Sequence, residues 1–186
     1  MKKTETTKYN DGNRFYILNE FDNDMRDGVV ANFTAKIDEL KSRRNETIEL
    51  WIDSNGGRAD LLFHLIELVE LAKRNGITVR TIVTARAYSA GSMLAVTGTK
   101  GERYISRLAD HLPHYGSFDG YRKTTPLQLD RDYEHFKRHS KKLIDHYKRY
   151  AEIPALEEKL KDDHLWIPAS KCIKWSLADK YMEELK

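Results

Sequence analysis

The 186-residue chain contains a single cysteine, Cys172, which excludes an internal disulfide and favours a reducing compartment. No spacing of cysteine and histidine resembles a zinc site. No apolar run approaches the roughly 20 residues that a membrane span needs, and no positively charged, apolar leader opens the chain. We therefore expect a cytoplasmic protein that holds no metal ion and does not contact a membrane.

Neither sign of charge dominates the sequence. Lysine and arginine number 32 against 29 aspartates and glutamates, a formal net charge of +3, which is too small to indicate a nucleic-acid partner. The length suits one domain with a substantial core. Residues 1–13 are polar and hold no apolar period. We expect them to form a flexible N-terminal arm, followed by a single domain over residues 14–186.

Strand and helix patterns alternate along the rest of the chain. The expected strands are Arg14–Leu18, Ile48–Ile52, Ile77–Val83 and Arg103–Ile105, with a turn at Asp53–Gly57. The expected helices are Asp24–Arg44, Ala59–Arg74, Gly91–Thr97, Leu127–Tyr150 and about Ser170–Trp175. This alternation predicts an α/β fold with a mainly parallel sheet and right-handed crossovers.

Ser89 lies where an apolar strand pattern passes into an apolar helix pattern. The residues from Ala87 to Gly91 are small apart from Tyr88, so a substrate backbone can approach closely, as in the nucleophile elbow of Gly-x-Ser-x-Gly enzymes. Amides at the start of a helix can also hold an anion. Taken alone, the pattern more often marks a packing serine than a nucleophile.

Several segments in the right order resemble the Clp protease proteolytic subunit family, whose members share the ClpP/crotonase fold. Leu50–Gly57 resembles the family's strand followed by Ser-Pro-Gly-Gly, and Ala87–Leu94 resembles its Ala-x-Ser-x-Gly-x-x-Leu segment. Gly98–Arg103 resembles its Gly-x-Lys-Gly-x-Arg, and Ser176–Asp179 its closing Gly-Leu-x-Asp. The resemblance implies repeated β-β-α units, a mainly parallel sheet and a long helix at about 127–150, called here the handle helix.

The resemblance also assigns a nucleophile and a base. Ser89 aligns with the family's nucleophile, and His114 with its general base if no gap separates the two segments. An imidazole suits this task because its ordinary pKa lies near neutral pH. A shorter alignment, with three residues deleted from the strand, selects His111 instead.

The same alignment implies the acid and the oxyanion hole. Asp163 corresponds to the carboxylate that orients the imidazole, with the adjacent Asp162 as an alternative. The backbone N–H groups of Gly57 and Ala90 correspond to the donors that stabilise charge in the transition state. The other histidines have no such support and are interpreted as solvated or structural: His64, His135, His139, His146 and His164.

Three residues depart from the family pattern near the expected site. Asn55 replaces a proline, Tyr88 replaces a small residue, and Pro113 falls where a strand is expected, although proline cannot donate a ladder hydrogen bond. The segment before Arg14 is shorter than in housekeeping members, which leaves an ATPase unfoldase partner open. These features resemble the Clp-related proteins of phages and mobile elements.

The resemblance implies a self-compartmentalising serine endopeptidase that cleaves polypeptides through an acyl-enzyme intermediate, without a cofactor. It implies a homo-oligomer of stacked rings joined by the handle helix. Two alternatives stay open: a catalytically silent assembly or binding protein, and a crotonase-type enzyme of acyl-CoA thioesters. The handle helix carries basic residues, but Asp130, Asp132, Glu134 and Asp145 lie among them, so we expect no nucleic-acid binding.

Overall fold

The computed structural model describes residues 10–115, 125–161 and 165–185. The first half of the chain forms β1 (Asn10–Asp11), β2 (Arg14–Phe21), α1 (Asn23–Met25), η1 (Arg26–Val30), α2 (Ala31–Leu40), β3 (Thr47–Gly57), α3 (Ala59–Arg74), β4 (Thr78–Tyr88) and α4 (Ala90–Val96). The second half forms β5 (Arg103–Ile105), β6 (Asp110–Leu112), α5 (Pro126–Tyr150), α6 (Leu156–Lys159), β7 (Ile167–Pro168), α7 (Ala169–Lys174), β8 (Lys180–Tyr181) and η2 (Met182–Glu184).

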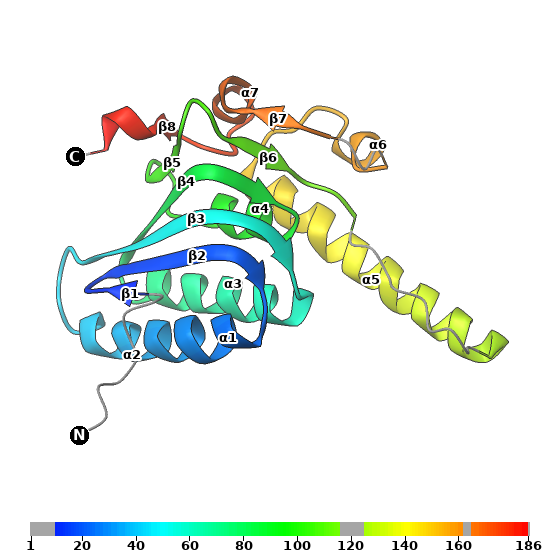
Figure 1. The fold of residues 1–186 in the computed structure, drawn as a ribbon, viewed down its shortest axis with the longest axis horizontal. Coiled ribbons are helices and arrows are strands. Elements are labelled where there is room, and N and C mark those ends of the chain that lie inside the picture. Colours follow the sequence, from blue (N-terminus) through cyan, green and yellow to red (C-terminus); the bar gives the residue numbers. More distant parts are fainter. Residues whose placement is uncertain (1–9, 116–124, 162–164, 186) are drawn as a thin grey trace.

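The strands of the described residues form one sheet in the order β1-β2-β3-β4-β5-β8 (Figure 1). The pairs from β2 to β5, and β5 with β8, are parallel. The second half of β4 pairs in parallel with β6, which pairs antiparallel with β7. This mainly parallel sheet with intervening helices confirms the predicted α/β fold.

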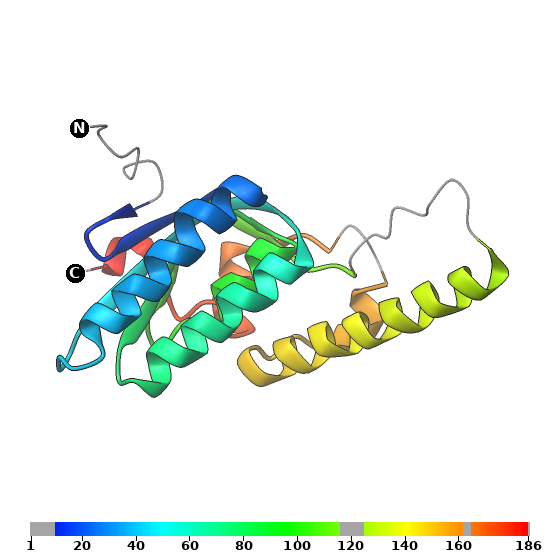
Figure 2. The ribbon, with the colours of Figure 1, turned by 90° about the horizontal axis from the view of Figure 1, so that it is seen from below.

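Helices α2 and α3 cover one face of the sheet (Figures 1 and 2). Strand β3 alternates in burial along its length, and its apolar side chains Ile48, Leu50 and Ile52 are almost completely buried. Phe33 of α2 and Leu65 of α3 are equally buried in the same core cluster. The apolar side chains that recur every second residue along the strands therefore pack against those that recur every 3.6 residues along the helices, in one continuous core.

Strands β3 and β4 extend well beyond the predicted Ile48–Ile52 and Ile77–Val83. The residues expected to form a turn at 53–57 belong to β3, because Gly56 and Gly57 pair with Glu20 and Phe21 of β2. A register shift between Asn19 and Glu20 accommodates the positive φ angles of the two glycines. The prediction of a turn was wrong because the sequence of residues 53–57 does not show that β2 pairs with them.

The helix predicted at Asp24–Arg44 is interrupted and ends early. A π-helical turn, η1, separates α1 from α2, and α2 ends at Leu40. Asn45 then adopts a φ of 60°, a left-handed conformation that asparagine tolerates better than most residues. The helix at Ala59–Arg74 and the strand at Arg103–Ile105 have the predicted bounds.

The handle helix is α5, which is 25 residues long and projects from the body of the protein (Figures 1 and 2). Thr125 caps it, and Pro126 occupies its first turn. At the other end of the chain, Asn10 and Asp11 pair with β2, so the arm expected over residues 1–13 includes a short strand. Residues 1–9 of that arm lie outside the described residues.

Candidate active site

Ser89 lies in a strained turn that joins β4 to α4. Its φ of 51° and ψ of −118° fall in a region that glycine favours and other residues rarely adopt. The Ser89 amide donates to the Leu112 carbonyl at 2.8 Å, and the Ser89 carbonyl accepts from the amides of Ser92 and Met93. A half-buried serine held on a sharp strand-to-helix turn has the backbone geometry of a nucleophile elbow.

The end of β3 packs against this turn backbone to backbone. A Cβ atom on Gly56 would lie 2.6 Å from Ser89 Cβ and 2.8 Å from the Tyr88 carbonyl oxygen. The fully buried Ser54 fixes this end of the strand, since its Oγ donates to the Asn19 carbonyl at 2.6 Å and accepts from the Gly56 amide at 3.1 Å. The position of Ser89 therefore depends on Gly56, which leaves the space that the turn occupies.

A cleft of about 920 Å³ opens beside the Ser89 turn. Four of the predicted site residues line it: Gly57, Ser89, Ala90 and His114. The handle helix contributes five further residues to the lining: His135, Phe136, His139, Ser140 and Leu143. Segments far apart in the sequence thus surround one concave space, which is the usual setting of an active site.

His114 reaches this cleft because β6 runs beside the end of β4. Tyr88 pairs with Leu112 in the parallel ladder, so Ser89 and His114 follow their strands at the same edge of the sheet. Pro113 comes directly after β6 ends, and its missing N–H removes no ladder bond. Within the described residues, no hydrogen bond joins the side chains of Ser89 and His114, although both line the cleft.

His111, the alternative base, is buried completely in the core. Its Nδ1 lies 3.0 Å from Ser92 Oγ, which accepts a hydrogen bond from the Tyr147 hydroxyl at 2.8 Å. Burial, and then the nearby charge of Arg103, lower the pKa of His111 from 6.5 to about 3. The lining of the cleft includes His114 but not His111.

The candidate acids Asp162 and Asp163 lie outside the described residues. The chain that follows them is anchored next to the site, because the Trp166 ring packs edge-on against Tyr88 with centroids 5.0 Å apart. Ile167 then pairs with His111 in the antiparallel ladder of β6 and β7. Tyr88, which departs from the family pattern, therefore contacts the segment that follows the acids.

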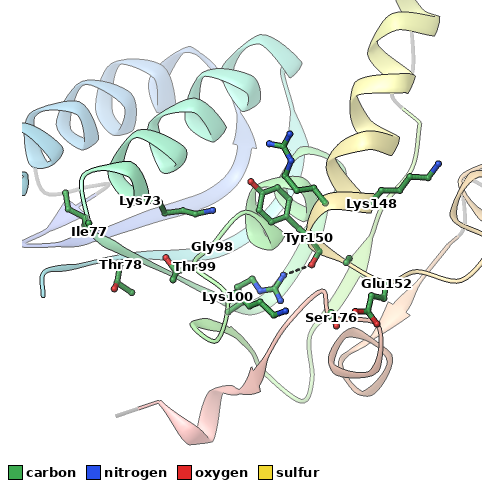
Figure 3. Close-up of a pocket in the computed structure, with 14 residues that line it drawn as sticks. Lys73, Ile77, Thr78, Gly98, Thr99, Lys100, Lys148, Tyr150, Glu152 and Ser176 are labelled. Atoms are coloured by element: carbon green, nitrogen blue, oxygen red, sulfur yellow. Dashed lines mark hydrogen bonds between the residues drawn. The ribbon is translucent and has the colours of Figure 1, made fainter.

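Figure 3 shows a second cavity, of about 550 Å³, at the opposite end of β4. Three of its six charged lining residues form ion pairs: Lys73 with Glu70, Lys148 with Glu157, and the buried Arg103 with Asp179. Arg103 also donates to the Tyr150 carbonyl at 2.8 Å. These contacts tie the closing segment and the end of the handle helix to the core, which is a structural role.

The sequence interpretation missed that Gly56 supports the Ser89 turn and that His135 and His139 line the cleft. His135 is exposed, in agreement with its interpretation as solvated or structural. The spacing of four residues between these histidines was the available signal, since it places them on one face of a helix. His146 does have a structural role, because its Nε2 lies 3.0 Å from Thr97 Oγ1 in a largely buried position.

Within the described part of the chain, no cluster of three or more histidine, cysteine or acidic residues could hold a metal ion. No helix in that part is both long and apolar enough to cross a membrane.

In this α/β fold a serine on a strained strand-to-helix turn thus shares a cleft with a histidine. The chain belongs to the Clp protease family, whose model matches residues 10–184. It is 27% identical over 167 residues to the ATP-dependent Clp protease proteolytic subunit of Lactococcus lactis subsp. lactis, covering 86% of this chain and 79% of that protein. The subunit of the same name from Streptococcus pyogenes is 24% identical over 87% of this chain and 83% of its own length.

Proposed function

We propose that the protein is a serine endopeptidase in which Ser89 attacks the scissile carbonyl and His114 acts as general base. The observation that carries this proposal is the shared cleft, which is lined by Ser89 on its strained turn, by His114, and by Gly57 and Ala90. Membership of the Clp protease family supports the same reaction class.

In this mechanism the His114 imidazole accepts the seryl proton and later returns it to the leaving amine. The backbone amides of Gly57 and Ala90 donate to the oxyanion of the tetrahedral intermediate. A requirement for main-chain donors agrees with the close approach of the β3 end to the turn: a Cβ on Gly56 would lie 3.0 Å from the Ala90 nitrogen. Water then hydrolyses the acyl-enzyme to release the second product.

For the acid we propose Asp163, with Asp162 as the alternative. The β6–β7 ladder supports this choice, because His111 pairs with Ile167 and the two strands run in opposite directions. His114 follows His111 by three residues, and Asp163 precedes Ile167 by four. In sequence, the acids thus precede β7 at the end of the ladder where the chain leaves β6 toward His114. The carboxylate would hold the imidazole in its productive tautomer without taking the proton.

We also propose that copies of this chain assemble through the handle helix into an enclosed, cytoplasmic peptidase chamber. The first half of α5 carries large apolar side chains that remain exposed in the single chain: Leu127, Leu129 and Tyr133. Leu129 and Tyr133, four residues apart, lie on one face of the helix, and exposed apolar side chains on a projecting helix favour burial against another chain. The names of the relatives include ATP dependence, and an ATPase partner for this chain stays an open part of the proposal.

Labelling with a fluorophosphonate and turnover of fluorogenic peptides test the proposal. We expect wild-type protein to be labelled and active, Ser89→Ala to be unlabelled, and both Ser89→Ala and His114→Ala to lose activity by at least about 10³-fold. His64→Ala, at an exposed position on α3, is the control and should match wild type. Native mass measurement on the same samples should give a particle larger than one chain.

Other outcomes identify the alternatives. Wild-type protein that assembles but leaves Ser89 unlabelled would be a silent assembly protein. Turnover of CoA thioesters that survives Ser89→Ala would indicate the crotonase-type reaction. Loss of activity in His111→Ala with full activity in His114→Ala would assign the base to the buried histidine instead.

A further inference from the structure

Two histidines of the handle helix face one another across one helical turn. His135 and His139 are four residues apart, and their Nε2 atoms lie 3.1 Å apart. Their ring centroids are 4.2 Å apart, with 38° between the ring planes. Residues at this spacing lie on the same face of a helix, so the helix brings the two side chains together and their rotamers set the separation of the nitrogens.

This separation matches that of two ligands on a single metal ion. With a metal–nitrogen length of about 2.05 Å, two imidazole ligands lie about 3.3 Å apart in tetrahedral geometry and about 2.9 Å apart at a right angle. The observed 3.1 Å falls between these two values. Little rearrangement of the rings is needed for both Nε2 atoms to bind the same ion.

The surroundings restrain one ring of the pair. The His139 ring packs against Phe63 of α3 with centroids 5.5 Å apart, which restrains its orientation. One side of the pair is therefore held against the protein body.

The pair also faces the cleft described above. His135 and His139 line it together with Ser89 and His114. The adjacent Ser140 lines the same cleft, and its buried Oγ has no hydrogen-bond partner among the described residues. This hydroxyl can accept a hydrogen bond from a water in the cleft.

We propose that His135 and His139 chelate a divalent transition-metal ion, of the Zn²⁺, Ni²⁺ and Cu²⁺ class, through their Nε2 atoms at the wall of the cleft. Imidazole nitrogen suits these ions, whereas Mg²⁺ and Ca²⁺ require oxygen ligands. The described residues supply two ligands and no third acidic, cysteine or histidine side chain. Water or a group of the bound polypeptide completes the coordination.

Calorimetric titration of untagged, metal-free protein with Ni²⁺ and with Zn²⁺ tests the proposal. We expect one ion per chain, no binding of Mg²⁺, and affinity at least about tenfold weaker in His135→Ala and in His139→Ala, because each variant loses the chelate. The matched control is His64→Ala, which removes a single exposed histidine from the neighbouring helix and should bind as wild type does.

Unchanged affinity in both handle variants, or the absence of any bound ion, would overturn the site. Circular dichroism of each variant shows that the comparison is made on folded protein. If the two histidines only hydrogen-bond each other and bind no metal, the titration should show neither one ion per chain nor weaker binding in both variants.

A second readout rests on the proposed function. An ion at the wall of the cleft narrows access to Ser89, so saturating Zn²⁺ should slow fluorophosphonate labelling several-fold in wild type but not in His139→Ala. If Ser89 is never labelled, the proposed function fails while the calorimetric result still decides the metal site. Equal slowing in wild type and His139→Ala would show that the ion acts elsewhere and would contradict its placement in the cleft.

Discussion

At the scale of single residues, the candidate site depends on the missing side chain of Gly56. The Ser89 turn occupies the space that a side chain at this position would need. Gly56 also has a φ of 98°, which disfavours any residue with a Cβ. Two separate requirements, backbone conformation and close approach, therefore coincide at one residue.

Replacing Gly56 with alanine should displace Ser89 as well as destabilise the fold. We expect a loss of about 3 kcal/mol in the free energy of unfolding, from the unfavourable φ and the contact with Ser89, together with loss of fluorophosphonate labelling. Urea denaturation measures the first effect. Gly76→Ala is the control, because Gly76 also has a positive φ but a Cβ added there would meet nothing within 4 Å.

Gly76→Ala should cost only about 1 kcal/mol and leave labelling intact. Equal effects of the two substitutions would show that backbone conformation alone matters and that Gly56 does not support the turn.

Local sequence indicated Ser89 because the serine, the small residues and the apolar patterns all lie within one short segment. Gly56 could not be assigned in this way, since its contact with Ser89 joins segments more than thirty residues apart. The same limit applies to His135 and His139. Their spacing is local, but the cleft they face is formed by other elements.

At the scale of elements, the handle helix is held mainly through its C-terminal half. Tyr147 is the one fully buried side chain of α5 within the described residues, and its hydroxyl donates to Ser92 Oγ of α4. Ser92 in turn contacts His111 of β6. Three elements therefore meet at one buried polar group, and the first half of the helix extends beyond it.

Tyr147→Phe should weaken this attachment. We expect the free energy of unfolding to fall by about 1–2 kcal/mol, because the buried Ser92 hydroxyl loses its donor. The same substitution at Tyr133, which is 62% exposed on the same helix, should change stability by less than about 0.5 kcal/mol. Chemical denaturation of the two variants makes the comparison, and equal stability would contradict the anchoring role.

The ends of the elements show what sequence periodicity can predict. Helix α3 was predicted with its observed bounds because an apolar stripe runs through it and Asn75 and Gly76 end it. The extensions of β3 and β4 were not predicted, since they depend on pairing with β2 and β6. The apolar periodicity of a segment indicates which of its faces is buried. The length of a strand depends instead on the strands that pair with it.

At the scale of the whole molecule, buried histidines make the fold sensitive to acid. Burial, and then Arg103, lower the pKa of His111 to about 3. Burial lowers the pKa of His146 to about 4, although a hydrogen bond with the Met93 carbonyl acts in the opposite direction and raises it. Between these values and about 6.5, the unfolded chain binds protons that the folded chain does not, so stability is full above this window and falls as the pH drops through it.

We therefore expect the free energy of unfolding to decrease from pH 7 to pH 4.5, by at most about 1.4 kcal/mol per pH unit for each of these histidines. Denaturation curves across this range measure the slope. His111→Asn should reduce it, because asparagine can still hydrogen-bond Ser92 but does not titrate. Identical slopes in wild type and His111→Asn would show that His111 does not control acid stability.

Because α5 is attached near one end, a small rotation at that end moves the other end through a larger distance. Its 25 residues span about 37 Å, so a rotation of about 5° at the Tyr147 anchor moves the far tip by about 3 Å. Small repacking around Ser92 is thereby magnified where two copies of the chain would meet. The spacing between subunits in an assembly would then be governed by a few buried atoms far from the surfaces that touch.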